Sequence, residues 1–156
     1  MTYSIDLLGH HPDLVPRVAR WHWDEWGADF SDSSLDEWTK QLAAKTRTDG
    51  LPCSWVAFAD DEPVGSVVLE LDGVEPQPEL KPDLAGLYVL PASRNRGIGS
   101  ALVRACEAGA REFGVLDLYL YTERAETLYA RLNWETLERT QFLGRPAAIM
   151  RRSLRS

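Results

Sequence analysis

Hydrophobic and polar positions follow two different repeats along the chain, and each repeat predicts a different secondary structure. Alternation at every second position, as in Tyr3 to Leu8, predicts a strand, whereas apolar residues three or four positions apart predict one face of a helix. In chain order the pattern predicts a strand at 3–8, helices at 14–26 and 35–42, strands at 54–59, 64–71 and 84–90, a helix at 97–113, a strand at 115–122, a helix at 123–132, and strands at 134–142 and 146–154. This order predicts one mixed α/β domain over residues 1–156, with helices flanking a twisted sheet.

Residues that favour helix ends delimit the first two helices. Pro12-Asp13 precedes the first, Gly27 ends it, and Ser33 or Ser34 caps the second. The first helix is expected to bury one face, made of Leu14, Val18, Trp21 and Trp26.

The long helix 97–113 shows the clearest stripe, with small or apolar residues at 98, 101, 102, 105, 109 and 113. Cys106 falls on its apolar side, where a buried, reduced thiol is expected. Glu107 and Arg111 are expected on the opposite, solvent-exposed side as an i,i+4 ion pair. The stretch from Asp72 to Asp83 contains three prolines and no periodicity, so it is a loop, interpreted either as a solvated connection or as a lid over an acceptor site.

Composition and charge exclude several classes of protein. Apolar residues make up 44% of the 156 and charged residues 26%, which is typical of a folded domain rather than a disordered chain. The net charge of −7, without a basic patch, argues against a nucleic-acid partner. No apolar run approaches the roughly 20 residues of a membrane span, and the N-terminus lacks signal-peptide features, so a cytoplasmic location is expected. The two cysteines and three histidines form no ligand spacing, so no metal is expected.

The segment that carries candidate chemistry follows the strand 84–90. Pro91 ends that strand, a polar turn follows, and Gly97 and Gly99 open the long helix. A helix N-terminus leaves about four backbone N–H groups without partners and carries roughly half a positive charge, so it suits a phosphate. Arg94 and Arg96 add positive charge at the same place. The segment therefore predicts a pyrophosphate site.

Two common phosphate motifs do not fit this segment. A dinucleotide-binding G-x-G-x-x-G would need glycine at Leu102, and a Walker loop would need Gly-Lys-Ser/Thr. What remains is Arg94-x-x-Gly97-x-Gly99, which resembles the signature Gln/Arg-x-x-Gly-x-Gly/Ala of the GNAT superfamily of N-acetyltransferases. The resemblance implies that the CoA pyrophosphate binds to a stretch of seven residues, namely Arg94, Asn95, Arg96, Gly97, Ile98, Gly99 and Ser100. It also implies that the pantetheine arm pairs with Leu87, Tyr88 and Val89.

A second match extends the resemblance over nearly the whole chain. Residues 125–134, Ala-Glu-Thr-Leu-Tyr-Ala-Arg-Leu-Asn-Trp, are similar to the family pattern A-x-x-L-Y-x-x-L-G-F. Asn133 replaces the usual glycine, and asparagine tolerates the left-handed backbone that this turn needs. Thr122 stands where many relatives have asparagine in contact with the cofactor arm, and its hydroxyl can still form a hydrogen bond. The resemblance implies a mostly antiparallel sheet of about seven strands flanked by four helices.

The resemblance also implies a reaction: direct attack of a primary amine on acetyl-CoA through a tetrahedral intermediate. Tyr129 matches the position of the general acid that protonates the leaving sulfur, and a phenol with an ordinary pKa near 10 stays protonated at neutral pH. A core-packing tyrosine is the alternative for this position. A backbone N–H near Val89 would stabilise the oxyanion. Among the acids near the central strands, Asp83 is the candidate general base.

Three tryptophans between Trp21 and Trp26 cannot all face one helical stripe. In the GNAT family the first two helices border the acceptor site, so Trp23, Glu25 and Trp26 are candidate residues for binding a cationic amine. The alternative is that the tryptophans seal the helix pair or a dimer contact.

The function predicted by the resemblance is therefore an acetyl-CoA-dependent N-acetyltransferase acting on a small-molecule or peptide amine. Two other functions fit the same motifs, a CoA-binding sensor or partner-binding module without turnover, and an acyltransferase with a longer acyl donor. No membrane partner is expected, and the late strands offer edges on which a homodimer would form.

Overall fold

The computed structural model describes residues 2–74 and 77–155, and its elements follow the predicted order. The strands are β1 (Tyr3–Leu7), β2 (Cys53–Ala59), β3 (Glu62–Glu70), β4 (Asp83–Val89), β5 (Asp117–Thr122), β6 (Glu135–Phe142) and β7 (Arg145–Ser153). The helices are α1 (Val15–Trp26), α2 (Leu35–Ala43), α3 (Ile98–Glu112) and α4 (Glu126–Arg131), with short 3₁₀ turns η1 (Leu8–His10), η2 (Pro12–Leu14), η3 (Gly27–Asp29) and η4 (Pro91–Ser93). The predicted mixed α/β fold with seven strands and four helices is confirmed.

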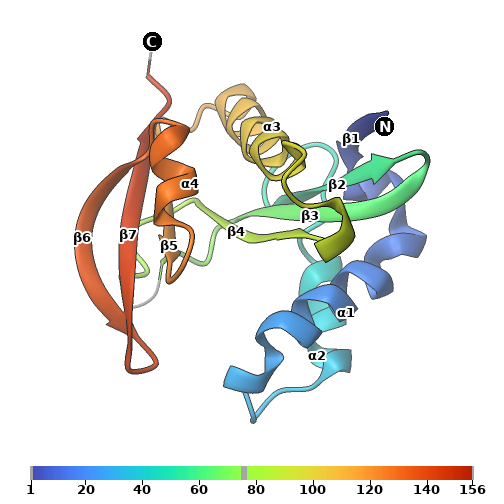
Figure 1. Ribbon diagram of the computed structural model, residues 1–156, viewed down its shortest axis with the longest axis horizontal. Helices are drawn as coiled ribbons and strands as arrows, with labels where there is room; N and C mark the ends of the chain where they lie inside the picture. The colour runs from blue at the N-terminus through green and yellow to red at the C-terminus, as the bar shows by residue number, and fades with distance from the viewer. Residues whose placement is uncertain (1, 75–76, 156) are drawn as a thin grey trace.

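The strands form one sheet in the order β1-β2-β3-β4-β5-β7-β6. Every neighbouring pair is antiparallel except β4 and β5, which run parallel. β4 and β5 pair only at Asp83 and Tyr119, so the sheet divides there into a half made of β1–β4 and a half made of β5, β7 and β6. Figure 1 shows the two halves diverging from this point, with α3 on one side of the sheet and α1 and α2 on the other.

Each face of the sheet has its own hydrophobic core. The larger cluster lies on the side of α3 and α4 and includes Leu102, Leu120 and Met150, each at most 1% exposed. The smaller cluster lies on the side of α1 and α2 and includes Val18 and Val68. Burying apolar surface on both faces drives the sheet to sit between the helices, because a sheet covered on one face only would expose hydrocarbon to water.

The buried face of α1 is rotated from the predicted one. Its buried residues are Val15, Val18, Ala19 and His22. Trp21 is only partly buried against the smaller cluster, and Trp26 lies beside Tyr88 of β4. The prediction missed His22 because an imidazole is polar by composition, and only its tertiary partners make burial favourable.

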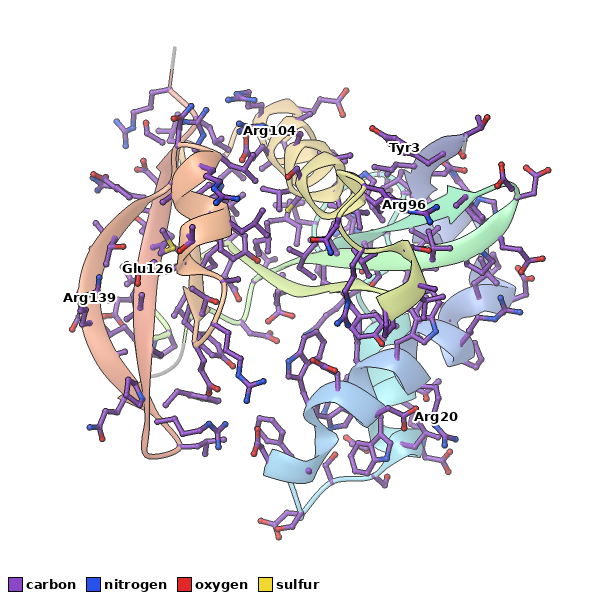
Figure 2. All side chains as sticks on the ribbon, viewed as in Figure 1. Tyr3, Arg20, Arg96, Arg104, Glu126 and Arg139 are labelled. Carbon is purple, nitrogen blue, oxygen red and sulfur yellow. The ribbon has the colours of Figure 1, made fainter. Side chains whose placement is uncertain are left out.

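The expected solvent-exposed position of Glu107 is wrong. Glu107 is 1% exposed, and its carboxylate accepts hydrogen bonds from Trp134 Nε1 at 3.0 Å and Arg104 Nη1 at 2.9 Å. Arg104 also donates to the carbonyl of Leu132, and Figure 2 shows it beside the segment after α4. The α4–β6 connection thus covers α3 at Glu107, which a single-helix pattern cannot reveal, whereas Arg111 one turn later stays exposed.

One further segment differs in extent from the sequence pattern. α4 begins at Glu126 rather than Glu123, because Thr122 Oγ1 accepts the Ala125 N–H and holds residues 123–125 in a turn. The stretch between Asp72 and Asp83 is a loop, as predicted, and its residues 75 and 76 lie outside the described residues. Within the described ranges, no helix has both the length and the apolar character needed to cross a bilayer.

Candidate functional site

The turn from β4 to α3 exposes a helix N-terminus. Gly97 is the N-cap, with a φ of +83° that favours glycine, and no atom lies within 4 Å of the place where a Cβ would sit. The first turn of α3 contains no acidic residue. Ile98 is 1% exposed and anchors the helix start in the larger core. The space beside Gly97 is therefore open, and no negative charge in the first turn of α3 opposes an anion.

The turn between β4 and α3 forms an arch of main chain. Side chains of this turn hold the arch in place. Arg94 Nε donates to the carbonyl oxygen of Val89 at 2.8 Å, and its guanidinium lies 5.6 Å from the centre of the Tyr88 ring. Asn95 has a φ of +63°, a left-handed angle that asparagine tolerates. Arg96 is exposed and lies on the turn that leads into α3 (Figure 2). The predicted pyrophosphate residues thus form one continuous stretch of chain.

β4 leaves part of its edge without a strand partner. Among the described residues, the side of β4 that faces β5 is not paired from Leu84 to Val89, because the parallel ladder stops at Asp83. A free strand edge offers backbone N–H and C=O groups to an extended ligand. The three residues predicted to meet the pantetheine arm, Leu87 to Val89, lie on this edge immediately before the arch.

Tyr129 lies on α4 across the gap between β4 and β5, in the larger core. It is 5% exposed and its ring packs at 5.7 Å from the Trp134 ring. Burial raises the pKa of the Tyr129 phenol, and the neighbouring Cys106 thiol adds to the rise, so the phenol keeps its proton at neutral pH. Thr122 Oγ1 accepts the N–H of Ala125 at 2.9 Å, which leaves its own hydroxyl proton available to donate.

Asp83 lies at the start of β4 among other acids. It is 5% exposed, stands opposite Glu70 in the β3–β4 ladder, and accepts the Gly73 N–H at 2.9 Å. Burial, followed by the negative charge of Glu70, raises the pKa of the Asp83 carboxyl to about 8. Lys45 Nζ binds Glu70 at 3.0 Å and Asp72 at 2.8 Å, so one cation partly balances the group.

The aromatic residues of α1 divide between two neighbours. Trp26 lies 6.3 Å from Tyr88, ring centre to ring centre, on the face of β4 away from α3. Trp23 instead packs edge-on against Trp38 of α2 at 5.5 Å. Glu25 is exposed. The structure therefore brings one of the three candidate acceptor residues, Trp26, to the strand that carries the free edge.

Acidic groups that the sequence did not single out surround this same side of the sheet. Arg145, at the start of β7, binds Asp29 of η3 and Glu123 after β5 at 2.9 and 3.0 Å. Burial raises the pKa of the Tyr121 phenol to about 12, and nearby negative charges act in the same direction, those of Glu123, Glu70, Asp83 and Asp29. Asp29, Glu123 and Arg145 lie far apart in the chain and in no recognisable motif, so no sequence signal marked them.

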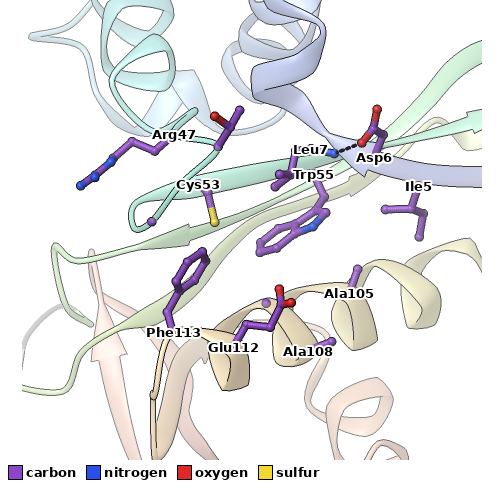
Figure 3. A pocket seen from close by; sticks show the side chains of 13 residues that line it. Ile5, Asp6, Leu7, Arg47, Cys53, Trp55, Ala105, Ala108, Glu112 and Phe113 are labelled. Atoms are coloured by element: carbon purple, nitrogen blue, oxygen red, sulfur yellow. Dashed lines mark hydrogen bonds between the residues drawn. The ribbon is translucent and has the colours of Figure 1, made fainter.

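A hollow of about 400 Å³ lies elsewhere, between β1, β2 and the C-terminal half of α3 (Figure 3). Cys53 borders it, but this thiol is 1% exposed and burial raises its pKa to about 11, so it is not a nucleophile at neutral pH. Among residues 2–74 and 77–155, no group of three or more His, Cys, Asp or Glu side chains is arranged to hold a metal ion.

Comparison with known proteins agrees with this geometry. A family model described as the acetyltransferase (GNAT) family matches residues 15–134. Among solved structures, an aminoglycoside 6′-N-acetyltransferase complexed with coenzyme A is 18% identical, with a TM-score of 0.75 over 100% of this chain and 98% of that one. The PaiA N-acetyltransferase from Thermoplasma acidophilum in complex with coenzyme A is 20% identical, with a TM-score of 0.67 over 98% and 99% of the two chains. A GCN5-related N-acetyltransferase from Ralstonia eutropha JMP134 is 28% identical, with a TM-score of 0.67 over 90% and 98%. Among curated proteins, none matches the chain.

Proposed function

The chain belongs to the GNAT family of acetyltransferases, and from this membership we propose that it transfers an acetyl group from acetyl-CoA to a primary amine. One observation carries the proposal: the unpaired edge of β4 leads directly into the glycine-opened N-terminus of α3. An extended thioester arm and its diphosphate need these two features in this order, a strand edge and then an anion site.

The proposed cofactor site fits a diphosphate in charge and in space. Gly97 leaves room for the phosphate oxygens, and Arg94 and Arg96 supply positive charge beside it. The backbone N–H groups from Asn95 to Ser100 would hold the diphosphate, with Asn95, Ile98 and Gly99 contributing main chain alone. The Arg94 N–H already donates to the carbonyl of Pro91 at 3.3 Å, so Arg94 would contribute its charge. The backbone of Leu87 to Val89 would hold the pantetheine arm, with Thr122 as a hydroxyl donor on the opposite strand.

Each chemical role has a proposed residue. Tyr129 would donate a proton to the leaving sulfur, a role supported by its protonated, buried phenol. A backbone N–H near Val89 would stabilise the oxyanion, because that edge of β4 has no strand partner. Neither Cys53 nor Cys106 is needed, since the amine attacks the thioester directly.

Asp83 is the proposed proton acceptor, acting through water. Leu87 follows it by four positions on β4, roughly 13 Å at about 3.3 Å per residue, so direct contact with the attacking amine is excluded. A carboxyl whose pKa is raised to about 8 suits proton transfer near neutral pH. The raised pKa predicts activity that increases as Asp83 ionises towards pH 8.

The acceptor amine is proposed to enter on the α1 side of the sheet. Trp26 and Tyr88 would form its aromatic wall, and ammonium groups are attracted to aromatic faces. The negative charges around Tyr121 favour a cationic amine over an anionic one. Glu25 would contribute further negative charge at the rim, and Trp23 would support the wall through its packing on α2.

The decisive test is Gly97→Glu, measured by calorimetric titration with acetyl-CoA. The wild-type protein should bind acetyl-CoA, and at about 100 times the Kd the ligand should raise the unfolding free energy by about 2.7 kcal/mol. A carboxylate placed at the diphosphate should weaken binding at least about hundredfold, because like charges held together cost several kcal/mol.

Gly114→Glu is the matched control. Gly114 has a φ of +79° and open space around its Cβ position, like Gly97, but lies at the other end of α3. It should bear the same backbone strain and keep acetyl-CoA binding. Thiol release from acetyl-CoA in the presence of spermidine, kanamycin, lysine or a short peptide then separates an enzyme from a sensor. Equal affinity of Gly97→Glu and wild type would overturn the proposed cofactor site.

A further inference from the structure

β4 contains a one-residue bulge at the start of the proposed acyl-binding edge. Val68 pairs with Ala85 and Ser66 pairs with Tyr88, so two residues of β4, Gly86 and Leu87, stand opposite one residue of β3. Gly86 has a φ of +59°, the left-handed angle that is common at such bulges. A glycine within a strand pattern is the one sequence signal of this feature.

The bulge decides which way the following side chains face. Leu84 packs in the larger core on the α3 side, so strict alternation would place residue 87 on the α1 side. The extra residue reverses this. Leu87 packs against the α3-side core, and Tyr88 faces α1, 5.9 Å from the Trp21 ring. Without the bulge, Leu87 and Tyr88 would exchange faces.

A buried chain of hydrogen bonds from α1 through β3 ends on the bulge. Ser66 Oγ, on a fully buried residue, donates to the carbonyl oxygen of Gly86 at 3.1 Å. His22 Nε2 lies 2.8 Å from the same Ser66 oxygen, and His22 is 7% exposed. Because the serine proton goes to the Gly86 carbonyl, His22 Nε2 must carry the proton that completes the chain.

The surroundings fix this arrangement of protons. Burial lowers the pKa of the His22 imidazole to about 4, and the positive charge of Lys45 acts in the same direction, so the ring is neutral with a single N–H. The packed neighbours are apolar or aromatic, with Val68 of β3 beside Gly86 and the Trp26 ring 5.4 Å from His22. The Gly86 carbonyl is half-buried, and a half-buried carbonyl that loses its donor lowers stability, so the bulge depends on these two side chains.

We infer that His22 and Ser66 are positioning residues for acyl-CoA binding: by holding the Gly86 bulge, they set the orientation of the edge Leu87–Val89 that receives the thioester arm. The inference rests on the proposed function. It assigns no chemical step to either side chain, and it predicts that they affect the arm of the ligand and not its diphosphate. An effect on binding of the arm without an effect on binding of the diphosphate distinguishes positioning from a general loss of stability.

The test compares two ligands on one variant. ADP keeps the adenosine and diphosphate of CoA and lacks the 3′-phosphate and the pantetheine arm. A change in the ratio of acetyl-CoA to ADP affinity between a variant that alters only β4 and the wild type therefore reports on the edge that binds the arm. Ser66→Ala should weaken acetyl-CoA binding about tenfold, the effect of one buried hydrogen bond, and leave ADP binding unchanged. Ser54→Ala is the control, because Ser54 is equally buried and donates to the carbonyl of Lys45 at 2.7 Å, away from β4. It should change neither affinity.

Conservative rescue provides a second, independent measurement. His22→Gln keeps an N–H donor the same number of bonds beyond Cβ, whereas His22→Leu removes it. The Gln variant should hold the acetyl-CoA to ADP ratio near the wild-type value, and the Leu variant should lower it like Ser66→Ala. If Ser66→Ala does not fold, this pair decides the matter. An unchanged ratio in Ser66→Ala or His22→Leu, or an equal loss for both ligands, overturns the inference. If the wild-type protein binds neither acetyl-CoA nor ADP, the proposed function is overturned instead.

Discussion

The two faces of the sheet around β4 bury different kinds of groups. On the α3 side, Leu102 is packed among hydrocarbon, Tyr129 is a buried phenol, and Glu107 of α3 is a buried carboxylate that accepts two hydrogen bonds. On the α1 side, β3 and β4 bury Ser66 and Asp83. Apolar burial stabilises a fold wherever it occurs, but a buried polar group lowers stability unless it has a partner.

This difference separates groups that the core needs from groups that it does not need. An apolar core needs only volume and shape, and many sequences supply both. The α1 face holds a bulge that requires a donor and a carboxyl with a raised pKa, and neither is needed to close the core. Groups that cost stability and persist in a protein are typical of functional sites. Three predictions, each with a control variant, sharpen or break this comparison.

The largest expected effect is that of Tyr129→Phe on the α3 side. Loss of the proposed acid should lower kcat for thiol release by about 10²- to 10⁴-fold and leave acetyl-CoA affinity unchanged. Tyr119→Phe, a phenol on β5 outside the buried cores, is the control and should keep full activity. Wild-type kcat in Tyr129→Phe would make this tyrosine a packing residue, and the α3 face would then be purely structural.

The next effect concerns stability. Leu102→Ala should lower the free energy of unfolding by about 2–5 kcal/mol, because Leu102 is fully buried in the larger core. Leu42→Ala is the same chemical change in the smaller core under α2, and it should cost less because Leu42 is 5% exposed there. Urea unfolding measures both. A larger loss for Leu42→Ala would contradict the assignment of the main stabilising core to the α3 face.

The last effect, the smallest for a change of one pH unit, is the pH dependence caused by Asp83. Its pKa is about 8 in the folded protein and near its ordinary value of 3.8 when unfolded. Between these values the folded state holds the extra proton, so stability falls as pH rises from about 4 to about 8, by at most about 1.4 kcal/mol per pH unit. Asp83→Asn should remove this slope, and its advantage over wild type should grow across the same range.

Glu70→Gln provides the control for that slope. Removing the neighbouring negative charge should lower the pKa of Asp83 towards its ordinary value and shorten the pH range over which stability falls. Urea unfolding of the three proteins between pH 4 and 9 measures the effect. A wild-type stability that does not change over this range would mean that Asp83 is ionised at neutral pH despite its burial.

The element order was predictable because it is local, and the turn proposed as the anion site was readable for the same reason. The repeat of apolar positions specifies which residues of one element face the core, and β5 and α3 were placed almost to the residue. The arch at Gly97 was equally readable, since a glycine before a helix start and two nearby arginines act within a few residues of one another.

The rest of the candidate site depended on distant parts of the chain. Glu107 looks solvent-exposed on a helical wheel, yet Trp134 and the connection after α4 bury it. Arg145 is held by an ion pair with Asp29, which lies more than a hundred positions away in the sequence. No local pattern encodes such partners.

The sequence alone therefore determined the elements, the family and the place proposed for the diphosphate, because short-range periodicity and backbone conformation are properties of neighbouring residues. The tertiary structure decided the burial of His22, the bulge at Gly86 and the raised pKa of Asp83. The physical reason is that desolvation and hydrogen-bond satisfaction depend on what folding brings within a few ångströms, whatever the separation along the chain.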